Sequence, residues 1–195
     1  MIIKLAIRIM LSLAFILVSH GSIGYEASEQ DFERWGKNWD RLIPPGTYDF
    51  YPTDIDFNLM FDPVFQARLE AAGTLINHAV DGESIELAGF MVPTQIIEDK
   101  VTQFLLVPEA GQCIHVPPPP MNQTVLVDAG KFPIALRSPF EPVIVSGRIV
   151  VMQQTNQLAF TKYEEITEPQ QSIFEAAESG YILVDIKFAP LDLEG

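Results

Sequence analysis

Apolar residues in the first part of the chain recur at the spacing of a helix. Between Ser28 and Ile43 they return every three or four positions, which is typical of a helix with one buried face. Ser28 with Asp31 predicts a capping box at its start, and Pro44-Pro45-Gly46 ends it. A second helix is expected from Asp62-Pro63, as cap and first position, to Asp81-Gly82. The expected buried faces are Phe32, Trp35, Trp39 and Leu42 in the first helix, and Val64, Phe65, Leu69, Ala72, Leu75, Ile76 and Ala79 in the second.

From residue 84 onward the apolar residues alternate, which is the spacing of a β-strand with one buried face. Gly89 and Gly147 each occupy the centre of an alternating stretch, where glycine marks a bend of the kind that a small closed barrel needs. A short helix before the last strand is indicated by Ser172 with Glu175 as a capping box and by Gly180 as its end. Six strands are expected, at 84–92, 101–107, 122–127, 142–152, 158–166 and 181–188.

The order of these elements predicts a mainly β protein of the α+β class. We expect a small antiparallel Greek-key barrel of the oligonucleotide/oligosaccharide-binding (OB) type, preceded by the N-terminal helices. A β-sandwich is the second choice. Residues 84–195 would form the antiparallel β domain, and residues 25–83 a helical segment that packs on the barrel.

Residues 1–24 have the layout of a signal peptide. Lys4 and Arg8 make a positive start, and the apolar run at 9–18 is too short to span a bilayer comfortably. Small residues suited to cleavage follow at 19–24, and the lack of a cysteine there argues against a lipid anchor. We therefore expect a periplasmic protein with no transmembrane segment after signal removal. Secretion from the cell and a retained N-terminal anchor are the alternatives.

The charge balance narrows the classes of partner. The chain has 26 acidic and 12 basic residues, a formal charge of −14. Without Lys4 and Arg8 the basic residues fall to 10 and the charge to −16. A surface this acidic repels nucleic acid and anionic lipid headgroups, so no nucleic-acid partner is expected, and it favours cations and basic partners.

The most unusual stretch of the sequence is 111–123, GQCIHVPPPPMNQ. It contains the one cysteine, Cys113, and His115 two positions later. Residues two apart on an extended strand project on the same side. The next residues, Pro117, Pro118, Pro119 and Pro120, hold an extended polyproline helix of roughly 12 Å, which would fix the direction of the two side chains before it. Asn122 and Gln123 carry amides suited to tying down the end of the proline run.

Three interpretations of Cys113 and His115 stay open. The plainest is a cysteine that only packs, since free cysteine is among the most buried residue types. The second is a zinc or copper(I) site, with further ligands from His78, Glu109 or an aspartate. The third is a nucleophilic Cys113 activated by His115. Catalysis ranks last, because side chains at i and i+2 run parallel and the sequence indicates no third, orienting residue.

The prolines add a function of a different class. An exposed proline rod is a ligand for aromatic grooves on partner proteins. The alternative is that the rod packs on Trp35 or Trp39 of the same chain. Pro117, Pro118, Pro119 and Pro120, with Asn122 and Gln123, are therefore the candidate contact residues.

The same stretch resembles a known family. GQCIHVPPPPMNQTVLV, at 111–127, closely resembles the signature of a bacterial family of exported proteins known as domain of unknown function 3299. The likeness extends to WDRLIP at 39–44, DGESIELAGFMVP at 81–93 and VTQFLLVP at 101–108, so it covers most of the chain beyond the leader. It implies a periplasmic protein or a lipoprotein, and some members resemble companions of transporter and metal-homeostasis systems. It brings no established activity.

Together these features predict an exported, acidic, mostly β binding or accessory protein. Its site would be the Cys113-His115-proline segment, and zinc or copper would be the cofactor if a metal binds. Its expected partner is an envelope protein or a transporter component. The alternatives are a thiol-dependent enzyme that uses Cys113 with His115, and an interaction module that uses the proline run alone. Because the sequence contains none of the usual nucleotide, hydrolase or zinc-protease motifs, a non-enzymatic role is favoured.

Overall fold

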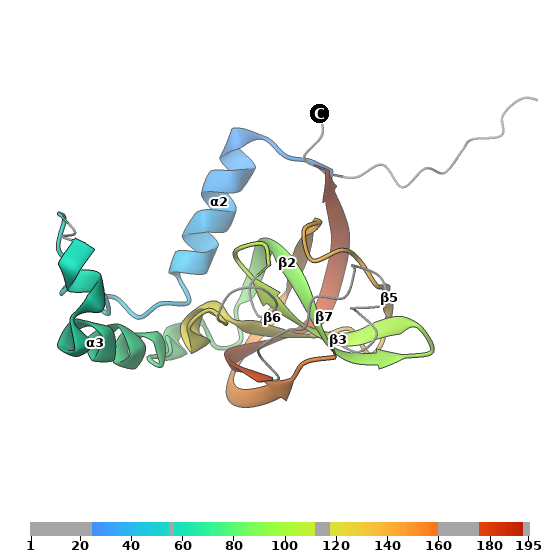
Figure 1. The fold of residues 1–195 in the computed structure, drawn as a ribbon. Coiled ribbons are helices and arrows are strands. Elements are labelled where there is room, and N and C mark those ends of the chain that lie inside the picture. The colour runs from blue at the N-terminus through green and yellow to red at the C-terminus, as the bar shows by residue number, and fades with distance from the viewer. Residues whose placement is uncertain (1–24, 55–56, 112–117, 160–175, 193–195) are drawn as a thin grey trace, which may run out of the picture.

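The computed structural model describes residues 25–54, 57–111, 118–159 and 176–192 (Figure 1). The helices in these ranges are α2 (Glu29–Asp40) and α3 (Pro63–Gly73), with the 3-10 helices η1 (Phe57–Phe61), η2 (His78–Val80) and η3 (Met121–Gln123). The strands are β1 (Tyr25–Glu26), β2 (Ser84–Ile97), β3 (Lys100–Val107), β4 (Val125–Asp128), β5 (Ile134–Ala135), β6 (Pro142–Gln157) and β7 (Ala176–Asp192). No helix within the described ranges is long and apolar enough to cross a membrane.

Five of the described strands close into a barrel. Neighbours pair in the order β7, β4, β3, β2 and β6, and β6 pairs with β7 again, which completes the ring. The mainly β fold and the OB-like barrel predicted from the sequence are confirmed. One detail differs, because β4 and β7 run parallel while the other pairs of the ring are antiparallel. Alternation of apolar residues is the same in both strand directions, so the sequence pattern could not indicate this pair.

Strand β2 is long because it pairs with two neighbours in turn. Its first half, up to Phe90, pairs with β6, and its second half, from Phe90, pairs with β3. Gly89 lies at this change of neighbour, where an added Cβ would stand 2.4 Å from the carbonyl oxygen of Val107. Gly147 lies at a register shift of β6 against β7, with an added Cβ 2.7 Å from the carbonyl oxygen of Val184. Both glycines thus occupy irregular points of their strands, as the sequence predicts.

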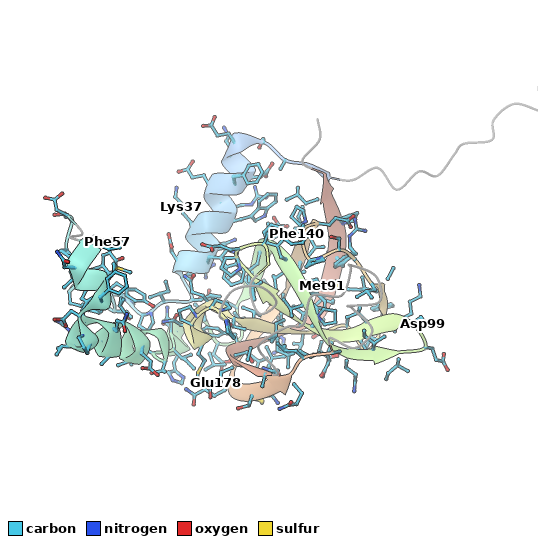
Figure 2. All side chains as sticks on the ribbon, in the orientation of Figure 1. Lys37, Phe57, Met91, Asp99, Phe140 and Glu178 are labelled. Atoms are coloured by element: carbon cyan, nitrogen blue, oxygen red, sulfur yellow. The ribbon has the colours of Figure 1, made fainter. Side chains whose placement is uncertain are left out.

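Strand β2 turns into β3 through a two-residue hairpin loop. Glu98 and Asp99 both have positive φ angles, 49° and 62°. Two residues with positive φ form the turn whose twist matches that of the flanking strands. Figure 2 shows Asp99 at the tip of this hairpin, far from the helices.

Strands β3 and β4 are buried on both faces. One apolar cluster fills the barrel and includes Met91, Phe104 and Val127 (Figure 2). A second cluster covers the outer side of the strands and is formed by Val92, Leu105, Val107, Leu126 and Ala177. The chain after β6 crosses this side, because Leu158 packs on the second cluster and the Ala159 N–H donates to the Pro93 carbonyl oxygen of β2. The face that OB-type barrels use for oligonucleotides is therefore occupied by the protein's own side chains.

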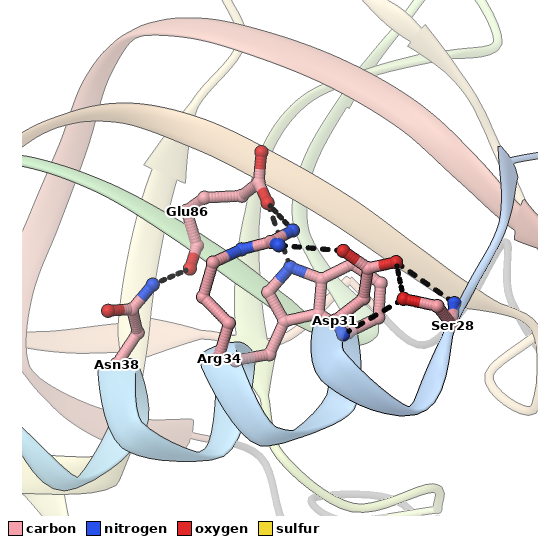
Figure 3. Close-up of polar contacts among 6 residues, drawn as sticks. Ser28, Asp31, Arg34, Asn38 and Glu86 are labelled. Atoms are coloured by element: carbon pink, nitrogen blue, oxygen red, sulfur yellow. Dashed lines mark hydrogen bonds and ion pairs between the residues drawn. The ribbon is translucent and has the colours of Figure 1, made fainter.

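Helix α2 begins with the predicted capping box and is bonded to β2 (Figure 3). The Ser28 hydroxyl accepts from the N–H of Asp31, and the Asp31 carboxylate accepts from the N–H of Ser28. Arg34 pairs with the Glu86 carboxylate of β2 at 2.8 Å and with Asp31 at 2.7 Å. Its hydrogen bonds to Glu86 and then Asp31 raise the pKa of Arg34. The Asn38 amide donates to the Glu86 carbonyl oxygen at 2.8 Å, which fixes the helix along the strand.

Both tryptophans of α2 pack against the barrel. Trp35 and Trp39 are 2% and 6% exposed. The Trp35 indole N–H donates to the Glu86 carboxylate at 2.9 Å, and that of Trp39 donates to the Ala88 carbonyl oxygen at 2.8 Å. Phe32 is half exposed, so the buried stripe of α2 is narrower than its spacing predicts.

The second predicted helix is shorter than expected. Asp62 caps α3 and Pro63 is its first residue, as predicted, but α3 ends at Gly73 rather than near Asp81. Val64 and Leu75 are exposed instead of buried. Figure 1 shows that α3 extends away from the barrel, so much of its surface is uncovered; Phe65 is buried against Phe50 and Tyr51, and the last turn is buried against the prolines.

The C-terminal part of the chain differs most from expectation. The strand predicted at 122–127 begins at Val125, because η3 occupies the three residues before Thr124. Of the strand predicted at 158–166, only the first two residues are described, and neither is in a strand. Residues 172–175 of the predicted helix lie outside the described residues, and the remainder, 176–180, is the start of β7. Pairing of this stretch with Gln154–Gln157 of β6 outweighs its local helical signals.

Tyr181 of β7 joins the barrel to the segments that precede it. Its side chain is fully buried. The hydroxyl donates to the carbonyl oxygen of Leu42, after the end of α2, and accepts from the N–H of Asn77 at 2.7 Å. Burial raises the pKa of Tyr181, and the bond from Asn77 acts in the opposite direction.

Candidate functional site

The described part of the proline segment is rigid and held at its C-terminal end. Pro120 has φ −55° and ψ 152°, close to the polyproline conformation. Its carbonyl oxygen accepts from the N–H of Gln123 at 2.8 Å and from the Thr124 hydroxyl at 3.1 Å. Pro119 is buried, Pro118 is half-buried and Pro120 is exposed. The segment is thus part of the protein's own wall, with one side turned to solvent.

The last turn of α3 fits closely against these prolines. A Cβ added to Gly73 would lie 2.8 Å from the Cβ of Pro120, so the backbone of α3 touches the proline ring. Asn122 is fully buried, and its amide donates to the carbonyl oxygen of Ala72 at 3.0 Å. Asn122 therefore holds the segment in place, and the prolines form the surface that another molecule can reach.

A hollow of about 460 Å³ lies between α3, the prolines and the ends of β6 and β7. We call it the proline hollow. Its volume lies within the range of roughly 300–1,000 Å³ that is usual for ligand pockets. Its lining consists of Leu69, Glu70, Gly73 and Thr74 of α3, Pro118, Pro119, Pro120 and Met121, Thr155 of β6, and Ala176, Ala177 and Glu178 of β7.

The proline hollow has apolar walls and two acidic groups. Glu70 and Glu178 are exposed, and no basic residue stands among the described lining. Figure 2 shows Glu178 on β7, at the end of the barrel from which α3 extends. Neither carboxylate has an ion-pair partner within the described ranges. The hollow therefore favours an apolar group that carries a positive charge beside it.

The predicted metal site lies outside the described residues, since these omit Cys113, His115 and Pro117. Two of the further ligands considered, His78 and Glu109, are described and exposed. The described part of the chain contains no group of three or more His, Cys, Asp or Glu residues that could hold a metal ion. A zinc or copper site at Cys113 and His115 stays a prediction from the sequence.

Sequence reasoning missed most of the residues that line the proline hollow. Glu70 and Thr74 have the pattern of an ordinary solvent-exposed helix face. Glu178 falls in the stretch that was expected to be helical. No local signal could have found them, because the hollow forms only where α3, η3 and the barrel end meet. Pro118, Pro119 and Pro120 are the predicted contact residues that the structure places in it.

A family model described as a protein of unknown function (DUF3299) matches residues 39–170. The chain belongs to this family. The crystal structure of a DUF3299 family protein from Pseudomonas aeruginosa PAO1 is similar to it, with 29% sequence identity and a TM-score of 0.50. The match covers 80% of this chain and 95% of the Pseudomonas chain. No curated protein matches. The DUF3299 match includes the proline run and the α3 part of the hollow, and it ends before β7.

Proposed function

We propose that this DUF3299 protein is an exported binding or accessory protein of the bacterial envelope, and that the proline hollow holds a basic, apolar segment of a partner protein. One observation carries the proposal: a rigid proline wall meets a hollow of ligand size whose charged groups are both acidic. An apolar side chain of the partner would enter between Leu69 and the prolines. A neighbouring lysine or arginine would lie near Glu70 and Glu178.

The chemistry of the hollow favours binding over catalysis. Its described lining offers two carboxylates and two threonine hydroxyls on apolar walls, without a histidine, cysteine or lysine. The described lining therefore lacks the cysteine and histidine that are commonly paired as nucleophile and base in acyl transfer and hydrolysis. Rigid walls suit binding, because little conformational entropy is lost when a partner docks on prolines.

Export and the envelope partner rest on the sequence. The signal-peptide layout of residues 1–24 supports export. The strong acidity of the chain supports a basic partner. A link to a transporter or to metal homeostasis is supported by the family resemblance alone, and the Cys113-His115 pair is the residue set through which a metal would act.

Two matched tripeptides test the binding proposal, Lys-Trp-Lys and Glu-Trp-Glu, each titrated into the purified protein while backbone amide NMR shifts are followed. We expect Lys-Trp-Lys to shift the amides of Gly73, Thr74 and Ala177, and Glu-Trp-Glu to leave them in place. The double variant Glu70→Gln with Glu178→Gln should weaken Lys-Trp-Lys binding by about tenfold, because each exposed charge pair that is lost contributes up to roughly 1 kcal/mol.

The control neutralises two acids that lie elsewhere on the surface. Glu33→Gln with Asp40→Asn removes the same charge from α2, away from the hollow, and should leave the affinity nearly unchanged. Equal loss in both double variants would reduce the effect to net charge and contradict the proposal. Absence of shifts at the hollow residues with either peptide would also contradict it.

A further inference from the structure

The barrel wall opens between β5 and β7. Strand β4 pairs with Tyr181–Leu183 on the edge of β7 that faces away from β6, and β1 pairs with Leu191 and Asp192. Between them, residues 184–190 have no strand partner on that edge within the described part of the chain. Strand β5 lies on the other side of the opening, where it pairs with the start of β3. Mouths and openings of barrels are frequent places for ligand sites.

A hollow of about 530 Å³ occupies this opening, and we call it the wall hollow. It shares no residue with the proline hollow. Apolar side chains make most of its lining, and three of them, Ile134, Ile186 and Phe188, also pack on the barrel core. Phe132 is 73% exposed beside it, so its ring is available to cover an apolar group in the hollow. The residues that matter for the argument are Phe132, Ile134, Arg137, Ile186, Lys187 and Phe188.

The charged groups of the wall hollow are both basic. Arg137 and Lys187 line it, and its described lining contains no acidic residue. This departs from the rest of a chain in which acidic residues outnumber basic ones by 26 to 12. The wall hollow and the proline hollow therefore carry opposite charge. An anionic group would be drawn to the wall hollow and repelled from the proline hollow.

Both basic groups have capacity left for an anion. Lys187 has no ion-pair partner among the described residues. Arg137 pairs with Glu141 at 3.1 Å through one terminal nitrogen, while its Nε is buried and has no acceptor within the described ranges. Asp185, the acid nearest to Lys187 along β7, is already bound to Lys131 at 2.9 Å and Arg148 at 3.5 Å. The Arg137 side chain is 29% exposed, and a carboxylate is an acceptor whose geometry matches the guanidinium group.

We propose that the wall hollow binds a small organic anion with an apolar body. The anionic head lies between Arg137 and Lys187. The apolar body lies along Ile134, Ile186 and Phe188 and is covered by Phe132. Medium-chain carboxylates and aromatic carboxylates both have this chemistry, so both are used as probes.

Four probes separate head charge from body shape: decanoate and 2-naphthoate as anions, and decyltrimethylammonium and 2-naphthylmethylammonium as cations with similar bodies. Each is titrated into the purified protein, and binding is followed by backbone amide NMR shifts and calorimetry. We expect at least one anion to bind and to shift the amides of residues 132–137 and 186–188. The cation with the same body should bind at least tenfold more weakly, and added salt should lower the affinity for the anion.

Two variants with exposed side chains test the residues without threatening the fold. Lys187→Gln should weaken the bound anion by about fivefold, which is the upper range for one exposed charge pair. Phe132→Ala should weaken it by about tenfold, because the cover over the apolar body is lost. Matched controls are Lys37→Gln on α2 and Phe57→Ala on η1, both exposed and far from the wall hollow (Figure 2), and neither should change the affinity.

The outcomes decide between this site and the proline hollow. Amide shifts confined to the wall hollow support the inference if anion binding is weakened in Lys187→Gln and unchanged in the double variant Glu70→Gln with Glu178→Gln. This holds whether or not Lys-Trp-Lys binds to the proline hollow. Equal binding of anions and cations, equal loss in the control variants, or no binding of either anion up to its solubility limit would overturn it.

Discussion

Removal of the Tyr181 hydroxyl should weaken the attachment of the N-terminal segments to the barrel. Tyr181 is fully buried, and its hydroxyl bonds both the Leu42 carbonyl oxygen and the Asn77 N–H. Tyr181→Phe keeps the ring and its packing but leaves two backbone groups without a partner. An unsatisfied buried group costs about 1–3 kcal/mol; because the Leu42 carbonyl bond is buried and the Asn77 N–H bond only partly so, the free energy of unfolding should fall by about 2–4 kcal/mol. For a chain of this size, that corresponds to a Tm lower by roughly 5–15 °C.

Urea unfolding of the wild-type protein, Tyr181→Phe and Tyr51→Phe measures this loss. Tyr51 is 38% exposed, so losing its hydroxyl should change the free energy of unfolding by at most about 0.5 kcal/mol. The comparison isolates the buried bonds from the general effect of a tyrosine-to-phenylalanine change. Similar midpoints for the two variants would refute the reasoning.

The stability difference between the wild-type protein and Tyr181→Phe should depend on pH. Burial raises the pKa of Tyr181 in the folded protein above the usual value of 10.0. Above about pH 10 the unfolded tyrosine loses its proton before the folded one does, so the unfolded state binds fewer protons and the wild type loses stability. Tyr181→Phe cannot lose this contribution. The stability gap between the two should therefore be complete below pH 10 and shrink above it, and a gap that stays constant to pH 11 would contradict the assignment.

Three further predictions use other parts of the chain. Gly36 lies on the exposed face of α2 with open space around it, so Gly36→Ala should stabilise the protein by up to about 1 kcal/mol. Gly89→Ala should destabilise it by about 3 kcal/mol, because the added Cβ would stand 2.4 Å from a carbonyl oxygen. Urea unfolding of both variants measures the contrast. If Cys113 and His115 bind zinc or copper, elemental analysis of protein purified without added metal should find it, and Cys113→Ser and His115→Ala should each lose it; metal-free protein with an unreactive thiol would favour a packing role. Intact mass of the exported protein should place its first residue between about Ser19 and Tyr25, and a membrane-bound form that keeps Met1 would contradict signal cleavage.

Local signals in the sequence predicted local structure well. The capping box of Ser28 with Asp31 and the Asp62-Pro63 start of α3 are both present, because each depends on residues that are neighbours in the chain. Alternation from residue 84 and the two strand glycines predicted a barrel, since a closed sheet requires both. These features need no knowledge of distant partners.

The remaining features depend on contacts between segments far apart in the sequence. The stretch that ends at Gly180 has a helical start signal at Ser172, yet its described part is a strand because β6 offers a pairing edge. Helix α3 ends at Gly73, where its last turn meets Pro120 and Asn122, residues that lie about 50 positions later in the chain. The wall hollow combines two segments that are far apart in the sequence and the proline hollow combines four, so the charge of each hollow could not be read from any one segment. The metal prediction at Cys113 and His115 falls on residues that the structure does not describe.

The strand that closes the barrel is also the one made last. Strand β7 pairs with β6, β4 and β1, and its Tyr181 reaches back to a residue 139 positions earlier. A ribosome adding about 5–20 residues per second therefore completes β2, β3, β4 and β6 seconds before β7, the shared neighbour of β4 and β6, exists. Until then β4 and β6 expose open edges, and the native ring cannot form. If the protein is exported as an extended chain, as proposed, the open ring would keep the barrel from folding before β7 has been synthesised.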